Sequence, residues 1–404
     1  MLLNKDRAVA LMQEQHLDAL VAVASPNVYY LSDYDAAEPK DVPWTAAAIL
    51  PRDTGTEPAL ILPDLELSLF AERPSWMPVQ AYHFSFDNES IAVFDTSVDE
   101  PLDDLDTKIN ALLSDAVTAN GSAGSVRAVA RALRRTGLAN ARVGFDDIRF
   151  GQLVHETLKN LQPVDAAALL VRIRLVKSAE ELTLMRRAAT INQGAIEAAI
   201  ATAKTGVSWP EVPRAWRQHL LSQKARPFSL LGGAGAKAAG PLRTNVPYPI
   251  APGVPIAFDA MLTYRGYFGD LQRTCVIGDP SPKLKRYWSA VQAGALATYE
   301  KIAPGVSTAS LRALAVDTIR QAGQGQFRIA IVHGLGLEHI EIPGAWGGRL
   351  HSFTLEPGMV INIDLEVHEL GFGAVAFEES MLVTETGAER LISLPRELLQ
   401  CAGG

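Results

Sequence analysis

Residues 256–274, IAFDAMLTYRGYFGDLQRT, predict two strands joined by a tight turn. A two-residue turn beginning at Tyr264 would place Asp259 directly opposite Asp270, and one beginning at Arg265 would place the two acids diagonally on the same face. Either register crowds two carboxylates, and a fold tolerates such a pair when a cation or a shared proton offsets their repulsion. A three-residue turn would instead rotate one acid to solvent. From the hairpin alone, a metal site and an ordinary polar hairpin are therefore equally compatible with the sequence.

Two later strands also carry acids. In residues 360–367, VINIDLEV, the side chains of Asn362, Asp364 and Glu366 alternate with aliphatic residues and share one face. The next strand carries Glu378 among small side chains, which favours the floor of a cavity. Taken alone, each strand fits a half-exposed sheet with a polar face better than it fits a site.

A histidine lies between these acidic segments. The apolar stretch 329–332 leads to His333, which is followed by Gly334 and Gly336. Glycines at such a point let the backbone approach whatever the side chain binds. A lone histidine is more typical of a core or surface position, but this one follows a pair of acids and precedes two acid-bearing strands. Carboxylates with one imidazole form a ligand set suited to Mn, Fe, Co or Zn.

The pattern of the chain changes near residue 165. Before this point, an amphipathic helix and short buried strands are typical of an α/β fold. Beyond it, Ser178 can cap a long helix and Glu181 can complete a capping box. The expected helices are residues 1–20, 178–201, 282–303 and 307–323, and the expected early strands are 18–23, 46–50 and 59–62. We therefore expect a domain boundary just before the capped helix.

Composition limits the class of protein. The 404 residues suggest two domains, and 48% apolar with 20% charged residues is a globular composition. The net charge is −8 and the basic residues are scattered, so we expect no nucleic-acid partner. The first residues carry charge early, and no apolar run reaches membrane-spanning length, so we expect neither a signal peptide nor a membrane partner. These features favour a cytoplasmic protein.

Several familiar motifs are missing or incomplete. The two cysteines, Cys275 and Cys401, lie far apart in the sequence and predict neither a disulfide framework nor a cysteine zinc site. Residues 233–238 fit a relaxed dinucleotide fingerprint, but the Gly-Pro that follows prevents the helix that this motif requires. The sequence has no Gly-x-Ser-x-Gly, no Walker motif and no His-Glu-x-x-His. Serine hydrolases, P-loop enzymes and ordinary zincins thus lack their usual signatures here.

Five motifs, taken in chain order, carry a specific resemblance. They are Asp259, GYFGDLQRT at 266–274, HGLG at 333–336, PGMV at 357–360 leading to Asp364, and FEESMLVTETG at 377–387. Together they resemble the pita-bread metallohydrolase family of Xaa-Pro dipeptidase (prolidase), aminopeptidase P and creatinase. Upstream, RLVKS at 174–178 resembles the interdomain linker of this family, and PNVYYLS at 26–32 resembles its N-terminal domain. The resemblance therefore covers essentially the whole chain.

The resemblance implies a fold and a division of the chain. Residues 1–165 would form an α/β N-terminal domain of the creatinase type. Residues 166–404 would form an α+β catalytic domain with the pita-bread (creatinase/aminopeptidase) fold. The family also implies a homodimer, with one protomer's N-terminal domain near the other's site.

The resemblance further implies a dinuclear metal centre. Asp259 would bind one divalent ion, His333 and Asp364 the other, and Asp270 and Glu378 both. Two close cations would lower the pKa of a water and polarise a substrate carbonyl, which indicates hydrolysis of an amide-type bond. The resemblance assigns catalytic roles to His339, Asp364 and Glu378, and substrate contacts to Tyr267, Arg273, Ile340 and Leu242.

Three positions depart from the family pattern. Asp364 stands where the acid is usually glutamate, and Glu366 on the same face could substitute for it. Ile340 stands where peptidase members carry a second, substrate-facing histidine, and His339 lies one position early. The neighbourhood of Leu242 lacks the histidine that precedes the first acid in peptidases. This pattern favours an altered substrate or altered chemistry.

Three functions follow from these observations. The first is a dinuclear metallohydrolase that cleaves a C–N bond in a dipeptide or small molecule, similar to Xaa-Pro dipeptidases. The second is a non-peptidase relative that resembles creatinase, ectoine hydrolase or dimethylsulfoniopropionate lyase, the last of which catalyses an elimination. The third is a catalytically silent scaffold that keeps the fold. The sequence leaves the substrate, the native metal and the number of ions open.

Overall fold

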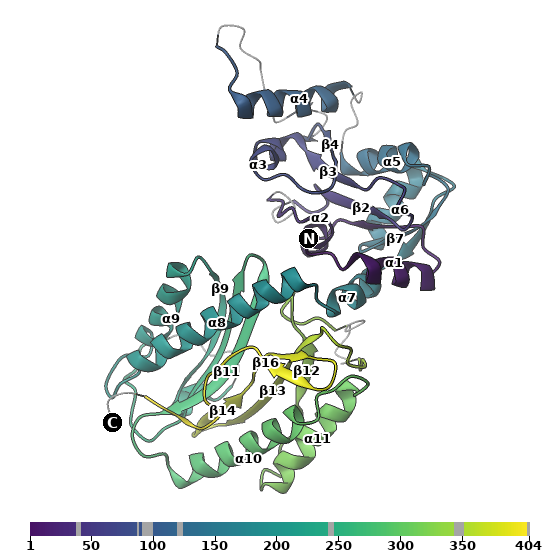
Figure 1. Cartoon of the computed structure of the whole chain (residues 1–404). Helices are drawn as coiled ribbons and strands as arrows, with labels where there is room; N and C mark the ends of the chain where they lie inside the picture. The colour runs from purple at the N-terminus through teal and green to yellow at the C-terminus, as the bar shows by residue number, and fades with distance from the viewer. Residues whose placement is uncertain are drawn as a thin grey trace. The chain divides into compact units, whose positions relative to one another are not determined.

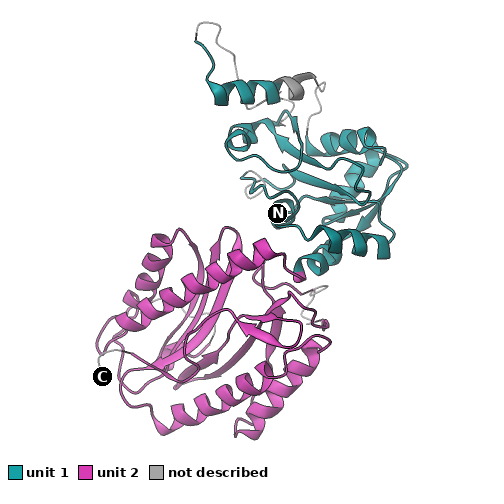
Figure 2. Cartoon of the chain, viewed as in Figure 1, with its two compact units in different colours: residues 1–174 teal, residues 175–404 magenta. Residues whose placement is uncertain are grey.

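The computed structural model describes residues 1–37, 42–86, 89–90, 100–118, 124–240, 246–342 and 351–401. Within these ranges the chain forms two compact units, residues 1–174 and 175–404 (Figure 2). The expected division after residue 165 differs from this one by a segment that holds most of helix α7 (Ala167–Leu175). The division into domains 1–165 and 166–404 stays a prediction.

A six-stranded mixed sheet forms the centre of the first unit, in the order β4-β3-β2-β1-β7-β8 (Figure 1). Its strands are β1 (Ala19–Ala22), β2 (Ala47–Pro51), β3 (Ala59–Pro63), β4 (Val79–Tyr82), β7 (Arg142–Phe145) and β8 (Gln162–Asp165). The other elements are α1 (Lys5–Glu14), α2 (Ser25–Ser32), α3 (Leu67–Glu72), α4 (Asp104–Thr118), α5 (Ser125–Arg135), α6 (Ile148–Thr157) and the short pair β5 (Ser85–Phe86) and β6 (Glu89–Ser90). The three early strands expected from the sequence are confirmed as β1, β2 and β3.

Two sheets and four long helices form the second unit. One sheet has the order β17-β11-β10-β9, and in the other β13 pairs with β12, β14 and β15, with β16 beyond β15. The strands are β9 (Arg226–Ala234), β10 (Ile256–Tyr264), β11 (Tyr267–Val276), β12 (Ile331–Gly334), β13 (Val360–Glu369), β14 (Gly373–Phe377), β15 (Met381–Val383), β16 (Ala388–Arg390) and β17 (Leu399–Gln400). The helices are α8 (Ala179–Thr202), α9 (Glu211–Ser222), α10 (Pro282–Tyr299) and α11 (Thr308–Gln321). Helix α8 packs on β10 and β11, and α10 packs on β13 and β14, so helices cover the outer faces of both sheets (Figure 1).

The long helix begins where the sequence predicts. The side chain of Ser178 accepts a hydrogen bond from the backbone N–H of Glu181, and the carboxylate of Glu181 accepts one from the N–H of Ser178. This reciprocal pair is a capping box, which satisfies two N–H groups that would otherwise lack a partner.

Helix α8 lies close to strand β11. A Cβ on Gly269 would lie 2.8 Å from the carbonyl oxygen of Ala188, so a glycine on β11 lets α8 approach the sheet closely.

The hairpin between β10 and β11 has the second of the two expected registers. Tyr264 pairs with Tyr267, and Arg265 and Gly266 form the turn with φ of 48° and 82°. Positive φ at both positions is typical of a type I′ turn, whose twist matches that of the flanking strands. Asp270 therefore pairs with Met261, and the three-residue turn is excluded. Asp259 and Asp270 lie diagonally on one face of the sheet.

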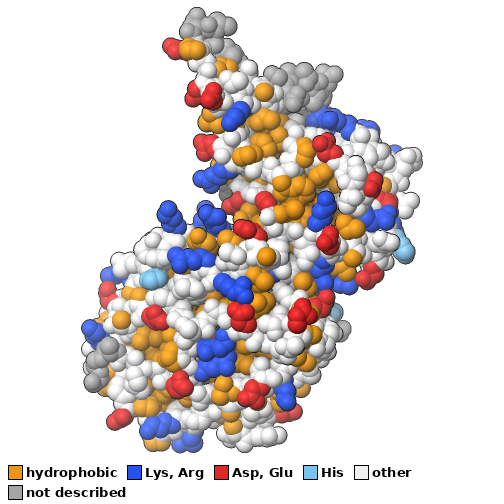
Figure 3. Space-filling view, viewed as in Figure 1, with side chains coloured by type: hydrophobic (Ala, Val, Ile, Leu, Met, Phe, Trp, Pro, Cys, Tyr) orange, Lys and Arg blue, Asp and Glu red, His pale blue; other side chains and the backbone are white. Residues whose placement is uncertain are grey.

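Surface features add little to the functional argument. Among the described helices, none combines the length and apolar character needed to cross a bilayer. On the face that Figure 3 shows, acidic and basic side chains are interspersed over the second unit.

Candidate metal centre

Backbone pairing brings the five predicted ligands into one region of the second unit. The hairpin supplies Asp259 and Asp270, and β12 supplies His333, which pairs with Asn362 of β13. The residue after β14, Glu378, donates its backbone N–H to the carbonyl of Gln272 on β11. Strand pairing thus joins the two sheets at the site.

The distances between these side chains suit shared ligands. His333 Nε2 lies 3.2 Å from Asp364 Oδ1, 3.6 Å from Glu378 Oε1 and 3.9 Å from Asp270 Oδ2. Within the described residues, three overlapping groups each have their ligand atoms within 4.8 Å of one another. The groups are His333, Asp364, Glu378; Asp259, Asp270, Glu378; and Asp270, His333, His339. Asp270 and Glu378 each belong to two groups, which is the arrangement expected of acids that bridge two ions.

Burial makes this cluster costly without a compensating charge. Burial raises the pKa of Asp259, Asp270 and Asp364 well above the usual range, and the neighbouring Glu378 raises it further. Burial acts in the same direction on Glu378, but hydrogen bonds with His333 and Asp364 prevail and lower its pKa to about 2. Burial also opposes charge on His333, yet Asp364 and Glu378 raise its pKa well above the usual value. Burial and mutual repulsion therefore favour protons on Asp259, Asp270 and Asp364 over charge, unless cations compensate for the charge.

The donor atoms at the centre fit divalent ions. His333 Nδ1 lies 2.9 Å from the carbonyl oxygen of Gly334, which can only accept, so Nδ1 carries a proton; Nε2 faces the acids and would offer its lone pair to an ion when the ring is neutral. Four buried atoms that find no hydrogen-bond partner of acceptable geometry among the described residues lie here: Asp270 Oδ1, His333 Nε2, Asp364 Oδ1 and Glu378 Oε2. Buried polar atoms are otherwise almost always paired. One imidazole with several carboxylates fits Mn, Fe, Co or Zn.

Uncharged residues around the ligands were not singled out by the sequence analysis. Asn362 is fully buried and donates from Nδ2 to Glu378 Oε1 at 2.6 Å. Gln272 donates from Nε2 to Glu366 Oε1 at 2.6 Å, and His368 Nε2 lies 2.7 Å from Glu366 Oε2. Hydrogen bonds of this kind orient residues that hold a metal, and here Asn362 orients Glu378. Their only signal in the sequence was the strand alternation that placed Asn362 and Glu366 beside Asp364.

Glu366 therefore lies near the centre without joining it. Of the three groups of possible ligands found among the described residues, none includes Glu366, and Asp364 belongs to one. The expectation that Glu366 could replace the shorter Asp364 remains a prediction.

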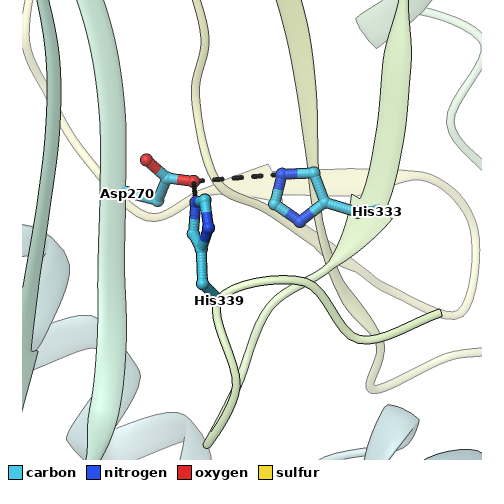
Figure 4. Close-up of side chains that lie close together, drawn as sticks. All are labelled: Asp270, His333 and His339. Atoms are coloured by element: carbon cyan, nitrogen blue, oxygen red, sulfur yellow. Dashed lines mark hydrogen bonds and ion pairs between the residues drawn. The ribbon is translucent and has the colours of Figure 1, made fainter. Parts of the chain in front are cut away.

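His339 reaches the centre although it lies one position early in the sequence. Its Nε2 lies 2.9 Å from Asp270 Oδ2, and Figure 4 shows its ring turned toward this carboxylate, beside His333. The ring lies near Phe228 and Phe268, with centroid distances of 6.1 and 5.8 Å. Burial and the neighbouring His333 lower the pKa of His339 to about 4, so the imidazole is neutral at neutral pH.

The residues expected to contact the substrate differ in burial and in their hydrogen-bond partners. Tyr267 is fully buried and its hydroxyl donates to Glu181. Arg273 is also fully buried, and its guanidinium is paired with Glu379. Ile340 is 47% exposed, and Leu242 lies outside the described residues. A substrate contact for any of the four stays a prediction.

An aromatic wall that the sequence analysis did not identify borders the centre. Phe228 on β9 is 59% exposed, whereas Phe268 is buried. Its ring meets Phe268 edge to face at a centroid distance of 5.0 Å, and both rings flank His339. Within the wall of Phe228, Phe268 and His339, Phe228 thus presents apolar surface beside a buried group of acids.

The fold and this centre define the class of a metal-dependent hydrolase with two domains. Residues 5–176 match the creatinase/prolidase N-terminal domain. Residues 179–385, about half of the chain, match metallopeptidase family M24, and the chain belongs to this family. The fold class expected from the sequence is confirmed.

The chain is similar to other proteins over 60% to 98% of its length. The Xaa-Pro dipeptidase of Pyrococcus horikoshii is 24% identical over 397 residues, which is 97% of each chain. An uncharacterised peptidase of Bacillus subtilis is 29% identical over 245 residues, 60% of this chain and 69% of its own. The solved structure of an Xaa-Pro dipeptidase from Bacillus anthracis has a TM-score of 0.73 at 20% identity and covers 98% of both chains. At this identity the structural likeness establishes the fold alone.

Proposed function

We propose that this metallopeptidase hydrolyses the C–N bond of a dipeptide or similarly small amide at a dinuclear centre of Asp259, Asp270, His333, Asp364 and Glu378. The proposal rests on two groups of possible ligands that share Glu378, each with its ligand atoms within 4.8 Å of one another. The full-length similarity to an Xaa-Pro dipeptidase supports a dipeptide as the first substrate class.

The bound ions would supply a Lewis acid and lower the pKa of a water molecule. The protein residues would set geometry around them. Asn362 fixes Glu378 through one short hydrogen bond, and His339 lies against Asp270 as a neutral imidazole that can donate or accept a proton. Phe228 and Phe268 would contact an apolar part of the substrate. These roles favour a small substrate with one apolar side chain.

A second candidate is a non-peptidase hydrolase or lyase of the same fold. Ile340 supports it, because an exposed aliphatic side chain cannot donate a hydrogen bond to a substrate or a developing oxyanion. Such a protein would keep the metal ligands and act on guanidino, amide or sulfonium compounds. Membership in a metallopeptidase family favours either candidate over a silent scaffold.

The two candidates are separated by a substrate panel assayed after elemental analysis. The protein would be loaded separately with Mn, Fe, Co and Zn, beginning with Mn, and tested on Xaa-Pro dipeptides with apolar or acidic first residues, and on guanidino, amide and sulfonium compounds. Cleavage of apolar Xaa-Pro dipeptides above the others supports the first candidate. Activity confined to non-peptide compounds overturns it in favour of the second.

Chelation is expected to remove activity and lower the Tm. An ion present at a hundred times its Kd contributes about 2.7 kcal/mol, and this corresponds to several degrees of Tm for a domain of this size. Without cations, the acids must take up protons or repel one another. Differential scanning calorimetry before and after chelation measures the shift, and addition of Mn should reverse it. An unchanged Tm would mean that the acids hold no metal.

We also propose a cytoplasmic homodimer. Light scattering is expected to give twice the monomer mass across the accessible concentration range, because the family resemblance implies that one protomer's N-terminal domain lies near the other's site. A single-chain mass at every concentration would contradict the dimer.

A further inference from the structure

The two cysteines of the chain meet in the second unit. The sulfur atoms of Cys275 and Cys401 lie 3.1 Å apart, and both residues are buried, with 0% and 5% of their surface exposed. Their distance in the sequence predicted no disulfide framework. The pairing of β17 with β11 brings the two residues together in space, and both cysteines carry free thiols.

The backbone fixes the position of both thiols. Strand β17 runs parallel to β11, with Cys275 opposite Leu399 and Val276 opposite Gln400. The N–H of Cys401 then donates to the carbonyl of Val276 at 2.9 Å. The two sulfurs therefore face each other across neighbouring strands.

We propose that Cys275 and Cys401 form a covalent modification site, which a small disulfide such as oxidised glutathione converts to an intramolecular disulfide. A protein S–S bond is about 2.05 Å long, so the sulfurs must approach by about 1 Å. Because the neighbouring strands already align the two thiols, the movement is a local adjustment of side chains.

The exchange proceeds in two balanced steps. The Cys401 thiolate attacks one sulfur of the oxidant, breaks its S–S bond and releases one glutathione thiolate. The Cys275 thiolate then attacks the Cys401 sulfur of the mixed disulfide and releases the second. The two cysteines lose two electrons to the oxidant, and their two protons pass to solvent and to the released thiolates.

The pKa values of the two thiols differ, which favours attack by Cys401 before Cys275. The hydrogen bond with Cys275 lowers the pKa of Cys401, whereas burial raises the pKa of Cys275. Strand β17 has two residues and two paired positions on β11, so local opening exposes Cys401 at small cost. Cys401 is therefore the thiol that meets the oxidant first.

The disulfide would close a loop that contains most of the proposed metal centre. His333, Asp364 and Glu378 lie between Cys275 and Cys401, while Asp270 precedes the loop on the same strand as Cys275. A link across this loop limits the freedom of the unfolded chain, so the oxidised protein should melt at a higher temperature.

Oxidised glutathione added to the full-length, metal-loaded protein tests the site. Intact mass should fall by two hydrogen atoms, and alkylation under denaturing conditions should find no free thiol. The Tm should rise by several degrees, and a phosphine reductant should reverse all three changes. Cys401→Ser should show none of them, and Cys275→Ser should retain a glutathione adduct on Cys401.

Three results would overturn the proposal: a stable glutathione adduct on the wild type, two free thiols after oxidation, or a disulfide between two chains. If Cys275→Ser fails to fold, Cys401→Ser and the wild-type mass decide the outcome alone. Because none of these measurements requires turnover, failure here leaves the proposed function untouched.

Discussion

Asp270→Asn is expected to lower turnover by at least about a hundredfold while the protein stays folded. Even residues that only orient metal ligands typically contribute about ten- to a hundredfold, and Asp270 belongs to two of the three ligand groups. The substitution removes the charge and almost no volume. Steady-state assays at saturating metal, together with elemental analysis, measure the loss.

The same variant should be at least as stable as the wild type once metal is removed. Fewer carboxylates then crowd the buried centre, whose acids raise one another's pKa. Asp317→Asn on the exposed face of α11 is the matched control and should leave both activity and stability unchanged. Wild-type turnover in Asp270→Asn would remove this residue from the site.

The protein is expected to be a slow Xaa-Pro dipeptidase, or one whose activity depends on His339. Removing a preorganised donor near a developing oxyanion typically costs about a hundred- to a thousandfold in rate. The side chain of Ile340 cannot donate a hydrogen bond, whereas His339 places a neutral imidazole 2.9 Å from Asp270. His339→Ala should therefore abolish most of any Xaa-Pro cleavage that the wild type shows.

The kinetic and metal data together identify how His339 acts. Loss of bound metal in His339→Ala would indicate that the ring orients Asp270, while a fall in kcat at full metal occupancy would indicate contact with the reacting atoms. The exposed His351 provides the control, and His351→Ala should match the wild type. Rapid Xaa-Pro cleavage that survives His339→Ala would return the protein to the ordinary prolidase pattern.

Strand periodicity was enough to predict the hairpin, and the resemblance carried by five motifs indicated the family, but neither determined the exact register. Two turn positions were compatible with the sequence, and both placed the acids on one face. The choice came from Arg265 and Gly266, whose positive φ angles fit a type I′ turn. A turn beginning one residue earlier would have required Tyr264, a bulky residue, to adopt this conformation.

The orientation of His339 could not be derived from alternation. A strand through residues 335–341 would turn neighbouring side chains to opposite faces, but these residues bend between two backbone hydrogen bonds that join Gly334 and Glu341. Cys275 and Cys401 show the same limit. Their contact depends on a two-residue strand, β17, whose partner lies more than a hundred positions away in the sequence.

The turn between β10 and β11 also restricts how this chain can change over evolution. Adding one residue at Arg265-Gly266 would move Asp270 to the opposite face of the sheet if the turn kept two residues, whereas a three-residue turn would leave the strand pairing and both acids in place. The connection between α10 and α11 carries no proposed ligand and is under no such restriction. Length changes at the β10/β11 turn are therefore compatible with the centre only where the turn itself, or a β-bulge, takes up the added residues and the strands keep their pairing.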